Sequence, residues 1–208
     1  ALLFVEDDEQ LDKALEVRPQ LPLLRKVIVF DMEGLRELND PDVMGLDDLR
    51  ALGRAWLAQH PDAVKQRAAA CQPGDLAILV YTSGTTGRPK GCVLTNEYFH
   101  YWGQWFLSRG HTLALKAGEE RLYNPLPLHH ANAFSISLPT MLLAGGCLVF
   151  PDRFHASTFW DDIVNCGVTA IQFQGVIPAI LLKLPETAQE RSHKVKFALC
   201  AGCEPSLH

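Results

Sequence analysis

Apolar, β-rich segments alternate with helical patterns in the second half of the chain, and this alternation constrains the fold more than any other feature. Strands are expected at 121–124, 147–150, 168–173 and 195–200, and helices at 134–144, 157–166 and 178–184. Gly145 and Gly167 stand where helix C-caps are expected. Strands joined through helices pair in parallel, with the helices on the faces of the sheet. The sequence therefore predicts an α/β fold with a mostly parallel sheet flanked by helices.

Fewer helices and strands are expected in the first part of the chain than in the second half. The spacing of leucines predicts helices over 9–17 and 46–60, and a β-branched run predicts a strand over 27–30. The polar residues between that strand and the second helix, 31–45, are expected to form a surface connection. We expect residues 1–75 to form a peripheral αβ segment and residues 76–208 to form the core, both within one piece of a domain.

The middle of the chain begins with a turn signal and an apolar run. After Pro73 and Gly74, residues 76–82 are almost continuously apolar, which is typical of a buried strand. A short extended segment is expected at 92–94, and a helix is expected to start at Thr95 or Asn96. The aromatic stripe of that helix (Phe99, Trp102, Trp105 and Phe106) is expected to be core.

Composition excludes several classes of protein. The chain has 208 residues, 48% of them hydrophobic, and a formal net charge of −5, a globular profile without the basic surface of a nucleic-acid binder. The apolar runs are too short to span a bilayer and the N-terminus lacks a basic region, so we expect no transmembrane segment, no signal peptide and a cytoplasmic location. The lone Cys200/Cys203 pair has no partner pair with metal spacing, and no metal site is predicted.

The loop at 81–91 carries the most chemical information. It contains three glycines, four aliphatic hydroxyls and two cations within eleven residues, directly after the expected buried strand. Glycines allow backbone N–H groups to approach phosphate oxygens, and hydroxyls and a lysine add further donors. The Walker A pattern is absent, because Arg88 follows Gly87 and Gly91 stands where a magnesium-binding hydroxyl is required. The loop predicts a site for a polyphosphate.

This loop resembles the phosphate-binding signature of the AMP-forming acyl-adenylating superfamily, which includes acyl-CoA synthetases and adenylation domains. Residues 125–133 resemble the family segment P-L-[FY]-H, with His130 matching the family histidine and His129 replacing the usual aromatic residue. Residues 197–205 resemble the strand and G-A-[EP] turn beside the adenine, with Cys203 replacing the usual alanine.

The resemblance implies a ligase that uses ATP, Mg2+ and coenzyme A to convert a small-molecule carboxylate first to an acyl-AMP and then to an acyl-CoA. It implies that His130 and Lys90 are catalytic. The implied nucleotide-binding residues are Thr82, Ser83, Gly84, Thr85, Thr86, Gly87, Lys90, Gly202, Cys203, Glu204 and Pro205. Gln174, Gly175 and Val176 follow a strand and border the acyl pocket in this interpretation, although ordinary loop packing explains them equally well.

Family members are more than twice as long as this chain. The resemblance therefore implies a piece of the AMP-binding N-terminal domain without the C-terminal domain, and we expect this piece alone to be inactive. Residues 130–133 and 154–162 resemble crotonobetaine/carnitine-CoA ligases, whereas residues 4–13 resemble long-chain fatty acyl-CoA synthetases. The acyl substrate stays open between the two.

Other functions remain as alternatives at this stage. An adenylation domain for an amino or aryl acid would use the same loop, and a non-catalytic nucleotide-binding or interaction module would carry out no reaction. A P-loop phosphotransferase is disfavoured by the absent Walker geometry. His100, His111 and His155 are expected at the surface, and the sequence leaves open whether the chain forms a homo-oligomer.

Overall fold

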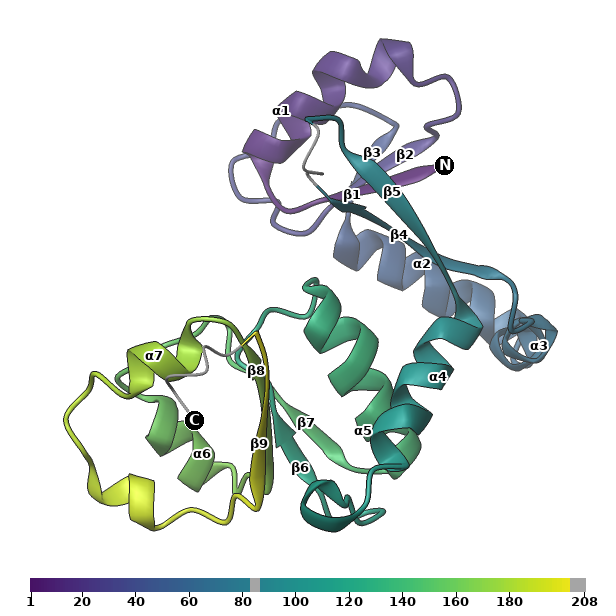
Figure 1. The fold of residues 1–208 in the computed structure, drawn as a ribbon. Coiled ribbons are helices and arrows are strands. Elements are labelled where there is room, and N and C mark those ends of the chain that lie inside the picture. Colours follow the sequence, from purple (N-terminus) through teal and green to yellow (C-terminus); the bar gives the residue numbers. More distant parts are fainter. Residues whose placement is uncertain (83–86, 203–208) are drawn as a thin grey trace. The chain divides into compact units, whose positions relative to one another are not determined.

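The computed structural model describes residues 1–82 and 87–202. The predicted nucleotide-binding residues Ser83, Gly84, Thr85, Thr86, Cys203, Glu204 and Pro205 lie outside the described residues. The chain divides into two compact units, Ala1–Cys71 and Gln72–His208, each of which is described by itself (Figure 1).

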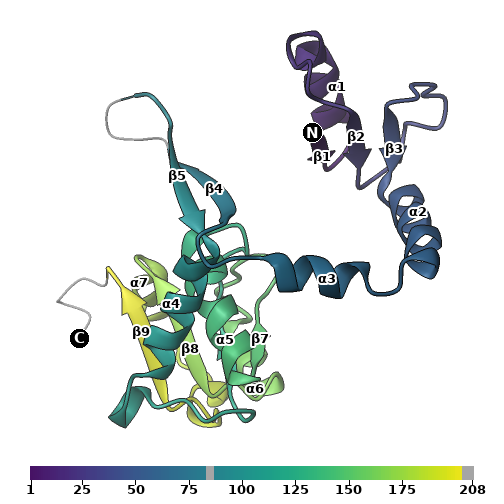
Figure 2. The ribbon, with the colours of Figure 1, turned by 90° about the vertical axis from the view of Figure 1, so that its right-hand side faces the viewer.

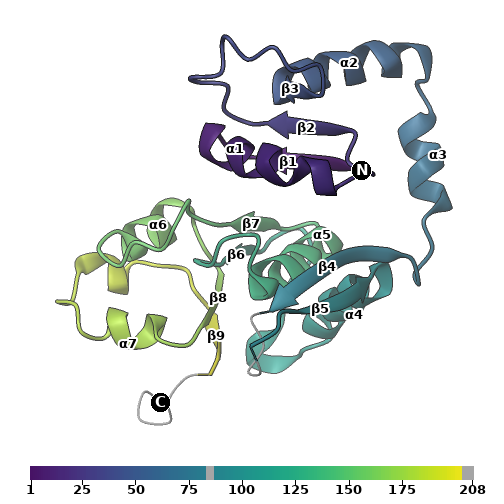
Figure 3. The same cartoon turned by 90° about the horizontal axis from the view of Figure 1, so that it is seen from above.

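The first unit is a small parallel αβ layer. Its sheet has the order β1-β2-β3, formed by Leu2–Val5, Lys26–Val29 and Val43–Gly45, and both strand pairs are parallel (Figure 3). Helix α1 (Asp8–Val17) follows β1 and continues into a 3-10 turn at Arg18–Gln20. Leu11 packs on Val27 and Val29 of the central strand. The predicted helix over 9–17 and strand over 27–30 are confirmed, but β3 lies inside the segment expected to be only a surface connection.

Two further helices complete the first unit. Helix α2 (Leu46–Gln59) ends one residue before the predicted end at His60, and α3 (Ala63–Ala70) follows it (Figure 2). Pro61 explains the break between them, because the residue before a proline avoids helical geometry and His60 has φ −133° and ψ 62°. No side chain of α2 is fully buried, and Leu52 and Trp56 are 57% and 47% exposed.

The second unit opens with a two-stranded antiparallel hairpin. Strands β4 (Leu76–Thr82) and β5 (Lys90–Thr95) pair only with each other among the described strands (Figure 2). A short connection joins them, and parallel pairing would need a crossover of a dozen residues or more. The prediction that residues 76–82 form a buried strand is wrong. Leu76 and Tyr81 are 58% and 69% exposed, because β4 is not sandwiched in the larger sheet.

A four-stranded parallel sheet forms the centre of the second unit, in the order β7-β6-β8-β9. Its strands in chain order are β6 (Arg121–Tyr123), β7 (Cys147–Val149), β8 (Ala170–Gln174) and β9 (Phe197–Ala201). All four predicted strands are therefore present, and the predicted parallel α/β architecture is confirmed.

Helices cover both faces of this sheet (Figure 1). Helices α4 (Asn96–Leu107) and α5 (Leu138–Ala144) lie on one face, where Phe106 and Met141 pack on Leu122. A π-helical segment, Ala133–Ser137, leads into α5. Helices α6 (Phe159–Asn165) and α7 (Ile177–Leu181) lie on the other face with Tyr123 and Ile171. Short 3-10 turns occupy His111–Leu113 and Ala188–Arg191.

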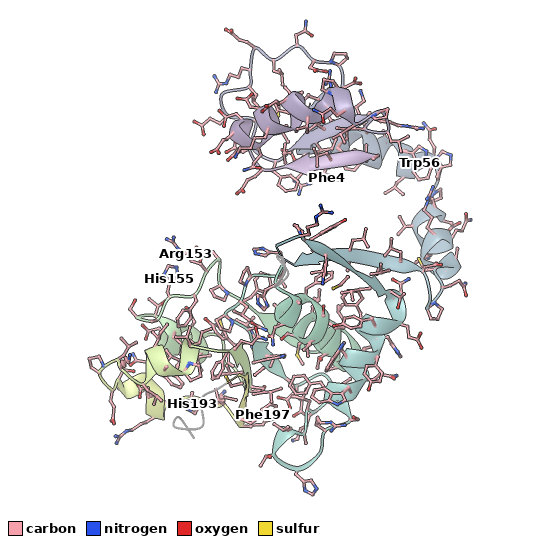
Figure 4. The ribbon with its side chains drawn as sticks, turned by 45° about the horizontal axis from the view of Figure 1, so that its top comes forward. Phe4, Trp56, Arg153, His155, His193 and Phe197 are labelled. Carbon is pink, nitrogen blue, oxygen red and sulfur yellow. The ribbon has the colours of Figure 1, made fainter. Side chains whose placement is uncertain are left out.

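The predicted caps of two helices are confirmed. Gly145 has φ +63° and Gly167 has φ +60°, the left-handed conformation that lets a chain leave a helix and that glycine adopts without strain. Phe197, labelled in Figure 4, starts β9, and its ring centroid lies 6.4 Å from that of Phe106. After each of these two glycines the chain leaves the helix and enters the next strand of the sheet.

Candidate functional site

The ends of β8 and β9 bring two predicted site segments together. Gln174 is the register partner of Ala201, and the backbone N–H of Gly175 donates to the carbonyl of Ala201 at 3.0 Å. Gly175 (φ +58°) and Gly202 (φ +73°) then turn the chain away from both strands. Open parallel sheets bind ligands at this carboxyl edge. The residues at 174–176 therefore lie beside the start of the predicted adenine turn.

The loop after β6 holds His130 at the surface of the unit. A turn forms where the N–H of His130 donates to the carbonyl of Pro127 at 2.8 Å, and the N–H of Asn132 donates to Nδ1 of His130 at 3.1 Å. Because a backbone N–H can only donate, Nδ1 must accept, and the ring proton resides on Nε2. His130 therefore presents an N–H donor from an exposed imidazole.

A chain of buried polar side chains connects this loop to β8. The amide oxygen of Asn124 accepts from the N–H of Leu126 at 3.0 Å, and its amide nitrogen donates to Asn132 Oδ1 at 2.9 Å and Ser137 Oγ at 2.8 Å. Ser137 Oγ in turn donates to Gln172 Oε1 at 2.8 Å. All four side chains in this hydrogen-bonded series are at least nine-tenths buried. We call the series the amide chain, and its members are Asn124, Asn132, Ser137 and Gln172.

The sequence did not single out the amide chain as a group. Asn132 falls within the motif variant at 130–133 and Gln172 within the expected strand at 168–173, and neither pattern predicts their contact. A glutamine between the apolar residues Ile171 and Phe173 of an expected strand was the available signal, because buried amides require partners. The partners come from three separate segments of the chain, and no local pattern identifies them.

A cavity of about 230 Å³ lies against the amide chain. Trp102 and Trp105 of α4 form one wall, and Asn132 and Ile136 lie beside them, while residues at the ends of β8 and β9 complete the lining. The aromatic stripe expected to be core is thus divided, since Phe106 is fully buried whereas Trp102 and Trp105 border the cavity. A largely apolar cavity with a few fixed polar groups is suited to a small organic molecule.

The predicted phosphate loop follows a strand of the separate hairpin. Strands of one parallel sheet would carry this loop and the other candidate segments to a common edge, but β4 is not part of the four-stranded sheet. Gly87 has φ +85°, Lys90 is exposed and pairs in register with Thr82, and no ion pair joins Lys90 to another described residue. No hydrogen bond between described residues joins this loop to His130. Its assigned roles stay predictions.

The remaining candidates are surface features. Arg153 and His155 lie in the connection between β7 and α6, where His155 Nε2 is 3.6 Å from Asp152 Oδ1 (Figure 4). His100 and His111 are exposed, as expected. Within 1–82 and 87–202, no cluster of three or more His, Cys, Asp or Glu side chains could hold a metal ion. The helices described are all too short or too polar to cross a membrane.

A parallel α/β unit with a cavity at the carboxyl edge of its sheet is an arrangement that is typical of domains that bind small molecules. The chain belongs to the AMP-binding enzyme family, whose sequence profile matches residues 1–207. The resemblance drawn from the loop at 81–91 is thereby confirmed.

Similar proteins include named fatty-acid ligases and transport proteins. The chain is 33% identical over 167 residues to the medium/long-chain fatty-acid–CoA ligase FadD6 of Mycobacterium tuberculosis, covering 80% of this chain and 27% of that protein. It is 36% identical over 131 residues to the very long-chain fatty acid transport protein of Saccharomyces cerevisiae, covering 63% of this chain and 19% of that protein. The chain spans about a quarter of the length of these relatives or less.

Solved structures share the fold. The N-terminal domain of FACL13 from Mycobacterium tuberculosis superposes with a TM-score of 0.66 at 22% identity, covering 99% of this chain and 57% of that one. The anthranilate CoA ligase AuaEII, solved with anthranoyl-AMP, has a TM-score of 0.65 at 20% identity, covering 96% of this chain and 35% of that one. The fold is that of the N-terminal domains of acyl-CoA ligases.

Proposed function

We propose that the protein carrying this chain is an AMP-forming acid–thiol ligase. A carboxylate oxygen of the substrate attacks the α-phosphorus of ATP, and pyrophosphate leaves. The thiol of coenzyme A then attacks the acyl carbon, and AMP leaves with the bonding electrons. Membership of the AMP-binding family supports this reaction. The observation that carries the proposal is the cavity at the carboxyl edge of the sheet, next to the loop that holds His130.

His130 is proposed to act on the reacting oxygens. Its Nε2–H is a neutral donor on an exposed ring, held by the bond from the N–H of Asn132 to Nδ1. A donor directed at an oxygen that gains negative charge stabilises the transition state more than the ground state. This role requires the substrate carboxylate to lie at the carboxyl edge of the sheet, close to the turn at Gly202.

The loop at 81–91 is proposed to hold the β- and γ-phosphates of ATP. Lys90 supplies an exposed cation without an ion-pair partner in the described part of the chain, and Gly87 is already in the left-handed conformation. Mg2+ is proposed to enter as the ATP complex, because magnesium bound by phosphates and water needs few protein ligands. The turn that begins at Gly202 is proposed to contact the adenine, with Cys203, Glu204 and Pro205 beyond it.

The cavity is proposed to receive the acyl group. Two indole rings and Ile136 form an apolar wall. Gln174, the last residue of β8, and Gly175 and Val176, which follow it, are proposed to border the acyl group. A fatty acid is the substrate that the names of FadD6 and the other relatives favour. A cytoplasmic location, with ATP and coenzyme A at hand, is part of the same proposal.

Product analysis tests this function directly. The full-length protein is incubated with Mg-ATP, coenzyme A and a panel of carboxylic acids, and nucleotides are separated after the reaction. AMP, pyrophosphate and acyl-CoA in equal amounts are expected. ADP as the product would favour a phosphotransferase instead. Failure to bind either ATP or an acyl-AMP analogue in calorimetry would favour a non-catalytic module.

A further inference from the structure

The hydrogen-bond polarity of the amide chain follows from one unambiguous donor. The backbone N–H of Leu126 can only donate, so the atom of Asn124 that receives it at 3.0 Å is the oxygen. The other end of Asn124 is therefore the amide nitrogen, which donates to Asn132 at 2.9 Å and Ser137 at 2.8 Å. Because Asn124 donates to both Asn132 and Ser137, each of these residues must turn an acceptor toward it.

Each partner must accept on the side that faces the amide chain. Asn132 presents Oδ1 to Asn124, and its Nδ2 is therefore turned away. Ser137 accepts from Asn124, so its own proton is directed to Gln172 at 2.8 Å, where only Oε1 can accept. The Nε2 of Gln172 is turned away in the same manner. Two amide NH2 groups remain outside the amide chain.

Both NH2 groups belong to residues that line the cavity. Asn132 is 5% exposed and Gln172 is 2% exposed, and neither NH2 group donates to any described residue. Among the described residues, the buried polar side-chain atoms without a partner are the hydroxyls of Tyr123 and Ser135, so the two NH2 groups are still reached by a water-sized molecule. A ligand that displaces this water must accept from the NH2 groups, because a donor left unpaired costs about 1–3 kcal/mol. The cavity therefore offers two donors and, from Trp102, Trp105 and Ile136, an apolar wall.

We propose that the cavity takes an acid whose acyl body carries a hydrogen-bond-accepting oxygen, a carbonyl or hydroxyl, bound by the NH2 groups of Asn132 and Gln172. This inference rests on the proposed function and narrows its substrate class from plain fatty acids to oxygenated acids. An unsubstituted chain would leave both donors unpaired once it displaced the water.

The position of Gln172 favours the acyl body over the carboxylate as the bound group. Gln172 is the middle residue of β8, two residues before its last residue Gln174. At about 3.3 Å per residue, its Cα lies roughly 7 Å from the strand end. The carboxylate must remain at that end, near His130 and the nucleotide, so the donor on Gln172 meets atoms further along the chain. The volume of about 230 Å³, room for about eight water-sized groups, suits a short to medium-length acid.

The test compares acids that differ only in one oxygen. Octanoate and its 4-, 5-, 6- and 7-oxo derivatives are assayed by AMP formation with the full-length protein. We expect kcat/KM for at least one oxo acid to exceed that for octanoate by about tenfold or more, because a site with buried donors discriminates against a substrate that lacks their partner. Octanoate equal to or better than every oxo acid would overturn the inference.

Gln172→Met supplies the second measurement. It removes the donor while conserving volume, and we expect the oxo-to-plain ratio of kcat/KM to fall about tenfold. The ratio is internal to each preparation, so partial unfolding of the variant does not change it. Gln104→Met, at an exposed position of α4, is the matched control and should keep the wild-type ratio. An equal loss on both acids in Gln172→Met would show that the amide holds a group common to both, which overturns the inference.

The two proposals fail in different ways. AMP formation without a preference for an oxo acid would overturn only the inference about the acyl body. Absence of AMP with every acid, together with no binding of ATP, would overturn the proposed function and the inference with it.

Discussion

Asn132 donates its backbone N–H to Nδ1 of His130 at 3.1 Å, and the side chain of Asn132 is held by Asn124 at 2.9 Å. One residue thus orients the imidazole with its backbone and borders the cavity with its side chain. The reacting end and the acyl end of the proposed substrate would then be positioned by the same short loop, which is anchored in the sheet through the amide chain.

Replacing His130 tests the reacting end. In the full-length protein, His130→Ala should lower kcat/KM for AMP formation by about 100-fold, the usual effect of removing one donor to a developing negative charge. Binding of ATP, measured by calorimetry, should be little changed. The neighbouring exposed His129 provides the control, and His129→Ala should retain activity. Equal losses in both variants would indicate a general effect on the loop rather than a role of the imidazole.

The contact between α4 and α5 predicts a loss of stability in Gly103→Ala. A Cβ added at Gly103 would lie 2.7 Å from Leu143 Cδ1 and 3.0 Å from the carbonyl carbon and oxygen of Pro139. Backbone atoms cannot move aside cheaply, so we expect a loss of about 1–3 kcal/mol in urea unfolding. Gly53→Ala is the control, because a Cβ there meets nothing within 4 Å and α2 should gain roughly 0.5–1 kcal/mol. A stable Gly103→Ala variant would contradict the close packing of these helices.

Removing the hydroxyl of Tyr123 is expected to keep or raise stability, in contrast to the loss expected for Gly103→Ala. Tyr123 is 1% exposed, and its hydroxyl has no hydrogen-bond partner among the described residues. Burial, with a smaller contribution from the Asp162 carboxylate, holds the pKa of Tyr123 well above its usual value, so the phenol stays protonated. Tyr123→Phe should leave stability unchanged or raise it by up to ~1 kcal/mol in thermal unfolding, since no hydrogen bond is lost. A marked loss would reveal a partner for this hydroxyl.

The hydrogen bonds of the buried carboxylate of Glu120 are expected to make the stability of the fold depend on pH. Its buried carboxylate lies 2.6 Å from Lys196 Nζ and accepts from the N–H of Lys116 at 2.8 Å and from the hydroxyl of Thr169. Burial alone raises the pKa of Glu120, but the hydrogen bonds, from Lys196 first, outweigh it and hold the pKa below its ordinary value. A carboxyl whose pKa is lowered in the folded state contributes its full stabilisation at pH values above the ordinary pKa of a glutamate, roughly 4–5. That contribution is lost as the pH falls through the lowered pKa of the folded state.

Urea unfolding of wild type and Glu120→Gln between pH 7 and pH 3 measures this contribution. The wild type should be more stable at pH 7, and the difference between the two should shrink as pH falls below about 5. Glu9→Gln, at an exposed position of α1, is the control and should show little difference at any pH. A difference that grows on acidification would contradict the lowered pKa of Glu120.

The parts of the fold that were predictable are those with local causes. The four strands of the central sheet and the caps at Gly145 and Gly167 follow from apolar runs and from glycine geometry, which short windows contain. The exposure of Tyr81 and the strand at Val43–Gly45 did not follow, because they depend on which strand pairs with which. Gln172 is the clearest case in the site, since the orientation of its amide is set by Ser137 and, through Asn124, by the N–H of Leu126, and no pattern around β8 contains these partners.

The chain by itself is expected to be inactive, which is the remaining prediction. It spans about a quarter of the length of FadD6, and the proposed reaction needs groups that hold the ribose and the thiol in addition to the phosphate loop and the cavity. Positioning reactants can contribute about 7–11 kcal/mol to a barrier, so loss of part of that machinery abolishes measurable turnover. A pyrophosphate-release assay with the purified chain, Mg-ATP and the best acid of the panel checks this, with the full-length protein as the positive control. Robust turnover by the chain alone would show that its 208 residues contain every group the adenylation step requires.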